Sequence, residues 1–366
     1  MGALRLALPS EGALYDGAES FMRACGLTVL RANARRYTAE VPSLPGVEVL
    51  YQRQTDITPE VDTASADAGI AGLDRYYEAR REGGDTVVAL DDLGFGGSRL
   101  VIAVPDSWLD VTSVSDLADL ALEFRERGRE MRVATKYPRL VGRFLTARGV
   151  NYVSLVQASG GLEAAPTMGY ADLIADIVAT GATMRENRLR PLVDGAVVES
   201  RAALIANGRQ LASDPEKLAV MRELLERIEA SLRARGFQRI TANIQGESAA
   251  DVARLVMSER RFGGLQGPTV SDVFSDDGKR WFAAQVVVPR DDLLEAVRHF
   301  RSLGGSGITV NDASYVFRRE CEAYERLRES LVPFESAGKR GAGGLDNPGG
   351  PARRRQAPGE RRGRKA

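Results

Sequence analysis

The order in which strand-like and helix-like segments follow one another constrains the fold of this chain more than any other feature. Apolar runs with the character of strands occupy residues 4–8, 27–32, 47–53, 68–71 and 86–89, with helical patterns between several of them. Strands that alternate with helices form largely parallel sheets covered by helices. After Gly236 the pattern changes to β-α-β-β-α-β over residues 240–311, which is the ferredoxin-like plan. The sequence therefore predicts an α/β region followed by a small α+β domain.

A pair of glycines marks the approach to a second lobe within the α/β region. Gly96 and Gly97 interrupt an apolar stretch and permit a tight bend. Strands are expected beyond them at residues 132–135, 152–157 and 173–178, and segments 193–199 and 202–206 return the chain to the first lobe. Two lobes joined by paired crossovers enclose a cleft, where small-molecule sites are common. The predicted division is 1–105 and 194–236 for lobe I, 106–193 for lobe II, 238–330 for the ferredoxin-like domain and 331–366 for a disordered basic tail.

Residues 214–235 form the clearest helix in the sequence. Asp214 caps it, Pro215 takes the first helical position and Gly236 ends it. Its apolar stripe comprises Leu218, Met221, Leu225, Ile228 and Leu232, which predicts one buried face. Two shorter helices are expected, one over residues 16–25 with Gly26 just past its end and one that begins at Thr58-Pro59-Glu60.

The formal net charge of zero conceals a basic C-terminal tail. Residues 335–366 contain nine Lys and Arg against three Asp and Glu, so the rest of the chain is net acidic. An acidic body argues against nucleic-acid binding by the folded part. The tail is rich in Gly, Pro and Arg and cannot bury a core, so we expect it to be a disordered extension. Weak polyanion binding by the tail is the alternative interpretation.

The chain has few residues for histidine or cysteine chemistry. Its single histidine, His299, lies in an amphipathic stretch and is expected to be a surface or structural residue. Cys25 and Cys321 are expected to be reduced thiols, so a His/Cys metal cluster cannot be assembled. No signal peptide is expected, and no apolar run approaches the ~18–20 residues that cross a membrane. These features predict a cytosolic protein.

One segment has the composition of a phosphate-binding turn. Asp176-Ile177-Val178-Ala179-Thr180-Gly181-Ala182-Thr183 lies between an apolar strand and a short helical stretch, and we call its residues 179–183 the cradle. Backbone N–H groups there can converge on an anion, Thr180 and Thr183 add hydroxyl donors, and Gly181 leaves room for a phosphate oxygen. Asp172 and Asp176 share one face of the strand, where a carboxylate can accept hydrogen bonds from a ribose diol or lie near Mg²⁺. An ordinary strand-to-helix turn with a threonine cap is the alternative.

The neighbours of the cradle form an ordered set of motifs. In chain order they include Phe95-Gly96-Gly97-Ser98-Arg99-Leu100, Ala134-Thr135-Lys136-Tyr137-Pro138, Gly161-Leu162-Glu163-Ala164-Ala165-Pro166, Gly169-Tyr170-Ala171-Asp172, Glu186-Asn187-Arg188-Leu189 and Leu204-Ile205-Ala206-Asn207. The set strongly resembles that of ATP phosphoribosyltransferase, the first enzyme of histidine biosynthesis, over about residues 3–318. The resemblance implies an α/β fold with a two-lobed, periplasmic-binding-protein-like catalytic region and a C-terminal ferredoxin-like (ACT-like) α+β domain.

The resemblance also implies a reaction and its site. The family joins N1 of the ATP adenine to C1 of phosphoribosyl pyrophosphate and releases pyrophosphate, with Mg²⁺ required. Such a reaction depends on alignment and electrostatic stabilisation and needs no histidine base. The 5′-phosphate is expected on Ala179, Thr180, Gly181, Ala182 and Thr183, and the ribose diol near Asp176, with Asp172 as a second catalytic candidate. Candidates for contacts with phosphate, pyrophosphate or ATP are Gly12, Arg53, Arg99, Lys136, Arg139 and Glu163, and Mg²⁺ is expected to be held mainly by the substrate phosphates.

The C-terminal domain corresponds to the regulatory domain of the family's long form, which binds histidine as a feedback inhibitor. The short form lacks this domain and depends on a partner that resembles histidyl-tRNA synthetase, so this chain is expected to need no such partner. The long form assembles as hexamers from dimers, and a homo-oligomer is therefore expected here. Neither a membrane nor a nucleic acid is expected among the partners.

Two positions depart from the family's pattern. Residues 11–14 read Glu-Gly-Ala-Leu where the family commonly has Lys-Gly-Arg-Leu, so two expected cations are absent. Opposing a substrate phosphate with Glu11 is unfavourable unless Mg²⁺ or an arginine intervenes. Thr58 stands where the family often has proline. These departures keep a second hypothesis open, a catalytically weak or inactive two-lobed protein that binds or senses a ligand.

Overall fold

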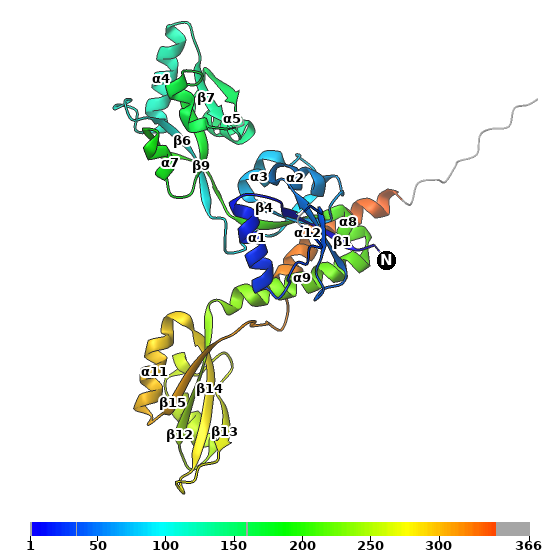
Figure 1. Ribbon diagram of the computed structural model, residues 1–366, viewed down its shortest axis with the longest axis vertical. Helices are drawn as coiled ribbons and strands as arrows, with labels where there is room; N and C mark the ends of the chain where they lie inside the picture. The colour runs from blue at the N-terminus through cyan, green and yellow to red at the C-terminus, as the bar shows by residue number, and fades with distance from the viewer. Residues whose placement is uncertain (1, 34, 159, 342–366) are drawn as a thin grey trace, which may run out of the picture.

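Three bodies follow one another along the longest axis of the molecule, with lobe I between lobe II and the C-terminal domain (Figure 1). The computed structural model describes residues 2–33, 35–158 and 160–341. Lobe I contains a six-stranded sheet, lobe II a five-stranded sheet and the C-terminal domain a four-stranded sheet. The expected α/β region of two lobes followed by a smaller α+β domain is therefore confirmed.

Lobe I is built on a mixed sheet in the order β2-β3-β1-β4-β11-β5. Its strands are β1 (Leu4–Pro9), β2 (Thr38–Glu40), β3 (Val47–Gln52), β4 (Ala68–Gly72), β5 (Thr86–Leu90) and β11 (Ala202–Asn207), and its helices include α1 (Ala13–Ala24), α2 (Gln54–Asp62), α3 (Leu73–Ala79), α8 (Gly208–Ser213) and α9 (Pro215–Ala234). Strand β1 is parallel to β3 and β4, but β11 is antiparallel to both of its neighbours because it enters from lobe II. The prediction of a largely parallel sheet was wrong in this respect.

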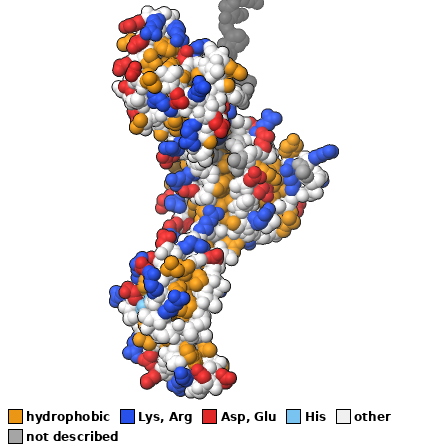
Figure 2. Space-filling model, turned by 60° about the vertical axis from the view of Figure 1, so that its left-hand side comes forward, with side chains coloured by type: hydrophobic (Ala, Val, Ile, Leu, Met, Phe, Trp, Pro, Cys, Tyr) orange, Lys and Arg blue, Asp and Glu red, His pale blue; other side chains and the backbone are white. Residues whose placement is uncertain are grey.

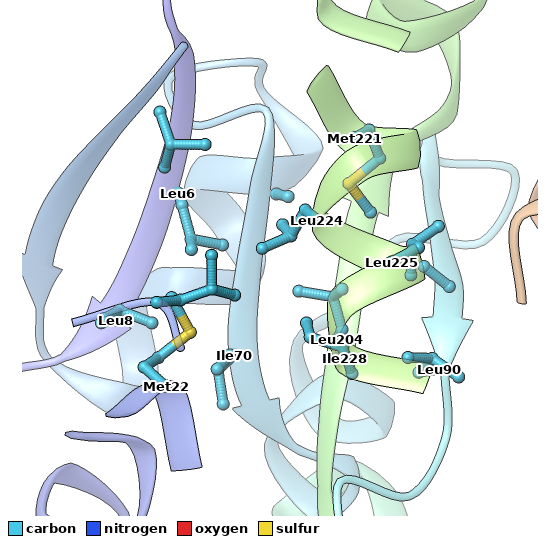
Figure 3. Packing of buried hydrophobic residues seen from close by; sticks show 14 of the residues in the cluster. Leu6, Leu8, Met22, Ile70, Leu90, Leu204, Met221, Leu224, Leu225 and Ile228 are labelled. Atoms are coloured by element: carbon cyan, nitrogen blue, oxygen red, sulfur yellow. The ribbon is translucent and has the colours of Figure 1, made fainter. Parts of the chain in front are cut away.

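The core of lobe I lies between α9 and the sheet (Figure 3). Met221 and Ile228 of α9 are fully buried in one cluster with Leu6 of β1 and Ile70 of β4. Each such side chain contributes roughly 1.5–3 kcal/mol by leaving water. The carboxylate of Asp214 accepts two backbone N–H groups of the first turn of α9, so both the helix and its predicted cap are confirmed.

Lobe II contains the sheet β10-β6-β9-β7-β8. Its strands are β6 (Ser98–Pro105), β7 (Met131–Thr135), β8 (Val153–Gln157), β9 (Leu173–Val178) and β10 (Leu189–Ser200), and its helices are α4 (Val114–Glu126), α5 (Pro138–Ala147), η1 (Leu162–Ala164), α6 (Ala165–Met168) and α7 (Ala182–Glu186). Two crossovers, β5 to β6 and β10 to β11, join the lobes. The lobe boundaries predicted at residues 105 and 194 were wrong, because the lobe II sheet includes β6 from Ser98 and β10 as far as Ser200. Two hydrogen bonds join the crossovers. The N–H of Leu93 donates to the carbonyl of Ala202 at 2.9 Å, and the N–H of Ala202 donates to the carbonyl of Phe95 at 3.0 Å. The bend predicted at the glycine pair is present, since Gly96 has a φ of +71°.

The C-terminal domain has the ferredoxin-like strand order β13-β14-β12-β15, entirely antiparallel. Its elements are β12 (Phe237–Gln245), α10 (Ala249–Val256), η2 (Arg260–Phe262), β13 (Thr269–Val273), β14 (Trp281–Pro289), η3 (Arg290–Asp292), α11 (Leu293–Ser302) and β15 (Ser306–Asp312). Nε2 of His299 lies 3.0 Å from the carbonyl oxygen of Val256, and its ring packs beside Phe262. His299 is therefore a structural residue, as expected.

After the C-terminal domain the chain returns to lobe I, which the sequence reasoning missed. Helix α12 (Glu322–Gly341) places Leu327 and Leu331 in the lobe I core. The ring of Phe334 covers Gly208 so closely that an added Cβ there would lie 2.4 Å from it. The disordered tail predicted from residue 331 is wrong for residues 331–341, and the domain boundary predicted at residue 330 falls inside this helix. Residues 342–366 lie outside the described part of the chain.

Two local predictions near the N-terminus were also wrong. The strand expected over residues 27–32 forms a single bridge, between Leu30 and Glu40. The helix expected to begin at Thr58 begins at Gln54 and contains Pro59 in its interior. Thr55 and Pro59 lie on the exposed face, so water can solvate the carbonyl that proline leaves without an N–H donor.

The surface carries charges of both signs. Figure 2 shows Lys and Arg side chains interspersed with Asp and Glu over all three bodies on the visible face. No helix in the described part of the chain is both long and apolar enough to span a membrane. Cys25 is buried, Cys321 is half-buried, and both are free thiols, as the sequence predicted.

Candidate functional site

The cradle connects the end of β9 to the start of α7. Gly181 has a φ of +75°, a left-handed conformation that glycine adopts at little cost. Thr180 and Thr183 are exposed, and neither hydroxyl makes a hydrogen bond to another described residue. The turn therefore presents two hydroxyl groups to solvent beside a position without a side chain, which is the arrangement an anion-binding turn requires.

Asp176 lies on β9, three residues before the cradle. Among the described residues its carboxylate accepts one hydrogen bond, at 2.8 Å from the N–H of Ile177. Burial raises the pKa of Asp176, the charge of Glu163 raises it further, and the charge of Lys136 opposes the rise. Thr135 is paired in parallel register with Ala175, so Lys136 and Asp176 follow side by side on neighbouring strands. Asp176 retains oxygen lone pairs that can accept hydrogen bonds from a diol.

Asp172 lies at the other end of the same strand and is fully engaged. Its carboxylate contacts the guanidinium groups of Arg129 (3.0 Å) and Arg132 (3.2 Å) and accepts the N–H of Arg132 at 2.8 Å. Burial alone would raise the pKa of Asp172, but the hydrogen bonds from Arg132 and Arg129 outweigh it and lower that pKa. The two aspartates are four positions apart, which corresponds to ~13 Å along an extended strand. This geometry favours an anchoring role for Asp172 over the catalytic role predicted for it.

A hollow of about 1230 Å³ lies on the surface of lobe II. Its wall includes Trp108, Arg132 and Asp172, but neither Asp176 nor the cradle. It therefore does not coincide with the site that the motifs predict.

Gly12 and Arg53 come together at the carboxyl ends of two neighbouring strands of lobe I. The N–H of Ser10 donates to the carbonyl of Gln52 at 2.8 Å, and an added Cβ on Gly12 would lie 3.6 Å from Nε2 of Gln54. Gly12 has a φ of +79°, and Arg53 is exposed at the N terminus of α2. Glu11 is exposed on the same loop, so its charge lies on the surface that Arg53 shares.

The two remaining arginine candidates differ in their surroundings. Arg99 on β6 is paired in register with Val178, which immediately precedes the cradle, and its side chain is exposed. Arg139 is directed toward lobe I instead, with its guanidinium 3.4 Å from the carbonyl oxygen of Glu78 and 3.6 Å from the carboxylate of Glu82. Arg99 is therefore placed to approach a ligand in the cradle, whereas Arg139 is held at the boundary between the lobes.

Sequence reasoning missed a cluster of polar residues at this boundary. The hydroxyl of Tyr137 donates to Oδ2 of Asp74 at 2.6 Å, and the guanidinium of Arg75 lies 4.2 Å from the centre of the Tyr137 ring. Burial raises the pKa of Tyr137, and the charge of Asp74 raises it further. A usable signal existed, because Asp74 and Arg75 directly follow the buried strand β4 at its carboxyl end, where ligand sites of α/β sheets gather.

Family models match most of the chain. A model of the ATP phosphoribosyltransferase family matches residues 53–230, and a model described as the HisG, C-terminal domain matches residues 234–314. The first match covers lobe II with the cradle and the part of lobe I from Arg53 onward, and the second covers the ferredoxin-like domain.

Individual relatives extend the similarity over nearly the whole length. The chain is 37% identical over 334 residues to ATP phosphoribosyltransferase 1, chloroplastic, of Arabidopsis thaliana, which covers 90% of this chain and 81% of that protein. It is 33% identical over 336 residues to ATP phosphoribosyltransferase of Bradyrhizobium sp. (strain ORS 278), with 90% and 99% covered. Among solved structures, the ATP phosphoribosyl transferase (HisG:HisZ) complex from Thermotoga maritima is 25% identical over 62% of this chain and 98% of that chain, with a TM-score of 0.48. The relatives from Arabidopsis and Bradyrhizobium show that the chain belongs to the ATP phosphoribosyltransferase family, and the match to the HisG, C-terminal domain shows that it has the form that carries this domain.

Proposed function

We propose that this protein transfers the phosphoribosyl group of phosphoribosyl pyrophosphate to ATP, the first step of histidine biosynthesis. A bond forms between N1 of the adenine and C1 of the ribose, while the bond from C1 to the pyrophosphate oxygen breaks and pyrophosphate leaves. The observation that carries the proposal is the cradle beside Asp176, with two hydroxyl groups and one carboxylate that the described residues leave available.

Each candidate residue binds the part of the substrate that its charge or its hydrogen-bonding groups complement. The cradle binds the 5′-phosphate, and Asp176 accepts hydrogen bonds from the ribose diol, so C1 is held at a fixed distance from both. Lys136 and Arg99 supply positive charge near the departing pyrophosphate, and Arg53 with Gly12 supplies a second phosphate contact from lobe I. Positioning of this kind accounts for much of the rate in reactions that pass through an oxocarbenium-like state.

The residues present fit Mg²⁺ only as an ion carried mainly by the substrate. In the described part of the chain no group of three or more His, Cys, Asp or Glu is arranged to hold a metal ion. Mg²⁺ usually keeps several waters and binds through one or two carboxylates together with substrate phosphates. Asp176 and Glu163 would be its protein contacts, and the ion would supply neutralisation of the pyrophosphate charge.

Mass spectrometry tests the reaction directly. The protein is mixed with ATP, phosphoribosyl pyrophosphate and Mg²⁺, and phosphoribosyl-ATP is expected as the product. The cradle variant Thr180→Val, which loses a hydroxyl and keeps its shape, is expected to form product more slowly. Repeated absence of product from the wild type, under conditions where a related enzyme is active, would contradict the proposal.

The exposed Glu11 favours a second candidate function, a ligand-binding or sensing protein with weak or no turnover. Calorimetry separates the two, because a sensor binds histidine and phosphoribosyl pyrophosphate without forming product. The double variant Glu11→Lys/Ala13→Arg restores the family's charges. A large gain in turnover in this variant would mean that the two substitutions limit a catalytic site, whereas no gain would mean that the other cations suffice.

Regulation and assembly complete the proposal. The C-terminal domain binds histidine as a feedback inhibitor, which the match to the HisG, C-terminal domain supports. The protein assembles as a homo-oligomer and works in a reducing compartment such as the cytosol, which its two free thiols support. Inhibition curves with histidine measure the feedback inhibition, and sedimentation velocity measures the oligomeric state. A monomer that is insensitive to histidine would contradict both the regulation and the assembly.

A further inference from the structure

A carboxylate of lobe I caps a helix of lobe II. Glu78, in the last turn of α3, accepts the backbone N–H groups of Arg139 and Leu140 in the first turn of α5, both at 2.9 Å. The first N–H groups of a helix have no partner inside the helix. Tyr137, at the N-cap position of α5, makes no side-chain capping hydrogen bond. Glu78 therefore supplies from the opposite lobe the cap that α5 lacks.

Other contacts join the same two helices, and we call the whole set the α3–α5 contact. Asp74, one turn before Glu78 on α3, accepts the hydroxyl of Tyr137. Arg139 extends in the opposite direction, to the carbonyl oxygen of Glu78 and the carboxylate of Glu82. Residues four apart on a helix share a face, so one face of α3 holds the N-terminal end of α5 through two carboxylates.

The start of α3 also contacts one of the paired crossovers that connect the lobes. The N–H of Leu73 donates to the carbonyl of Arg201 at 3.0 Å, and Asp74 accepts the hydroxyl of Ser200. Helix α3 is thus fixed to a crossover at its start and to α5 at its end, on the side of lobe I that faces lobe II (Figure 1). The two crossover strands alone would act as a hinge between the lobes. Helix α3, which is held at both ends, fixes the angle between the lobes at that hinge.

The restrained helix leads directly to the candidate site. Lys136 lies in the short connection between β7 and α5, one residue before Tyr137. Thr135, which precedes Lys136, is paired in parallel register with Ala175, which precedes Asp176, so Lys136 and Asp176 lie near the ends of neighbouring strands. A shift of the N terminus of α5 would move this connection and carry Lys136 away from Asp176.

We propose that Glu78 is a positioning residue for the phosphoribosyl transfer, because its cap across the lobe boundary holds Lys136 beside Asp176 and fixes the orientation of lobe II toward lobe I. The catalytic part of this inference rests on the proposed function, and the part that concerns lobe orientation does not. A site that is correctly arranged for only a fraction of the time binds with an affinity reduced by that fraction. Loss of a helix cap changes an equilibrium by about five- to twentyfold.

Three variants test the role of Glu78. Glu78→Ala removes both acceptors, and Glu78→Gln keeps one. Glu82→Gln is the matched control because it removes a carboxylate that pairs with Arg139 and Arg143 across the same boundary but caps no helix, and such exposed ion pairs contribute little to stability. In Glu78→Ala we expect the KM for phosphoribosyl pyrophosphate to rise about five- to twentyfold with kcat within about twofold. Glu78→Gln should recover part of this affinity, and Glu82→Gln should resemble the wild type.

Small-angle X-ray scattering and calorimetry supply readouts that need no turnover. Without substrate, Glu78→Ala should have a larger radius of gyration than the wild type, and it should bind phosphoribosyl pyrophosphate more weakly. A lower Tm in Glu78→Ala with unchanged KM and unchanged scattering would overturn the proposal, because the cap would then only stabilise the fold. An equal effect of Glu82→Gln would also overturn it. If the wild type makes no product, the proposed function fails, while scattering and calorimetry still decide the role of Glu78.

Discussion

The ammonium group of Lys217, in the first turn of α9, lies 2.8 Å from Oδ1 of Asp67, just before β4. The two side chains are only 8% and 0% exposed. The other carboxylate oxygen of Asp67 accepts the backbone N–H of Arg5 at 2.8 Å, so both oxygens of Asp67 have a partner. This pair joins the helix and the sheet that together form the core of lobe I.

Removing one partner of this pair should be more harmful than removing both. Lys217→Met leaves the buried carboxylate of Asp67 with only the partly exposed guanidinium of Arg5, at 3.6 Å, as a cation, and should lower the free energy of unfolding by up to ~3–5 kcal/mol. The double variant Asp67→Asn/Lys217→Met buries no unpaired charge and should be more stable than Lys217→Met alone. Urea denaturation measures both, and strictly additive losses would contradict the ion-pair account.

The two aspartates of β9 should give opposite phenotypes. Asp176→Asn removes the carboxylate that we propose binds the ribose diol, and it should lower kcat/KM for phosphoribosyl pyrophosphate by ~10²–10³-fold. Asp172→Asn breaks contacts with two arginines and should lower the free energy of unfolding by ~1–3 kcal/mol, with turnover near that of the wild type. Steady-state kinetics and urea denaturation of both variants check this, and a large kinetic loss in Asp172→Asn alone would reverse the assignment.

Asp176 should also make stability depend on pH. Because burial raises its pKa above the ordinary value of 3.8, the folded protein retains this proton to a higher pH than the unfolded chain does. The ionised carboxylate therefore destabilises the fold, fully above the raised pKa and not at all below 3.8. Asp176→Asn should consequently have a higher Tm than the wild type at pH 7. The difference should shrink as the pH is lowered toward 4, and a constant difference would contradict this cause.

Thr58 offers a substitution that should stabilise lobe I. Its hydroxyl is buried in α2 and has no hydrogen-bond partner in the described structure. Thr58→Val keeps the shape and removes the unpaired polar atom, so the free energy of unfolding should rise by ~1–2 kcal/mol. Thr58→Ser keeps the hydroxyl and loses a buried methyl group, and it should be destabilising. A loss of stability in Thr58→Val would indicate a water partner for the hydroxyl.

Helix α12 should behave as part of the lobe I core. Leu327 is only 1% exposed, and Leu327→Ala should lower the free energy of unfolding by ~2–5 kcal/mol. Val332 on the same helix is 57% exposed, and Val332→Ala serves as the control with an expected change within ~0.5 kcal/mol. Equal effects of the two substitutions would mean that α12 is not docked in solution.

Elements with local signals could be predicted from the sequence. The cap at Asp214, the apolar stripe that follows it and the end at Gly236 are all contained in about twenty consecutive residues, so α9 was predicted closely. The ferredoxin-like domain was predicted for the same reason, since each of its strands and helices has its own periodicity. The cradle was found because its small residues and its neighbours lie in a fixed order along the chain.

Relations between distant residues could not be predicted in this way. Tyr137 and Asp74 are 63 residues apart, and Glu78 and Arg139 are 61 apart, so no local pattern reports either contact. The alternation of the strand predicted one face for Asp172 and Asp176, but it could not report the arginines that engage Asp172, because they come from a different strand and loop. The docking of α12 was missed because the basic, glycine-rich composition beyond it obscured the four-residue spacing of its leucines.

The return of α12 means that the C-terminal domain is tethered to lobe I by both of its ends. One connection leaves from the end of α9, and the other runs back beside it. In the returning connection the hydroxyl of Tyr315 donates to the carbonyl of Cys25, and the N–H of Val316 donates to the carbonyl of Ala230. A single proteolytic cut in either connection would nick the domain without releasing it. A tilt of the domain would also displace both connections at once. One of them continues into α12, which packs against β5, the strand from which the chain crosses into lobe II.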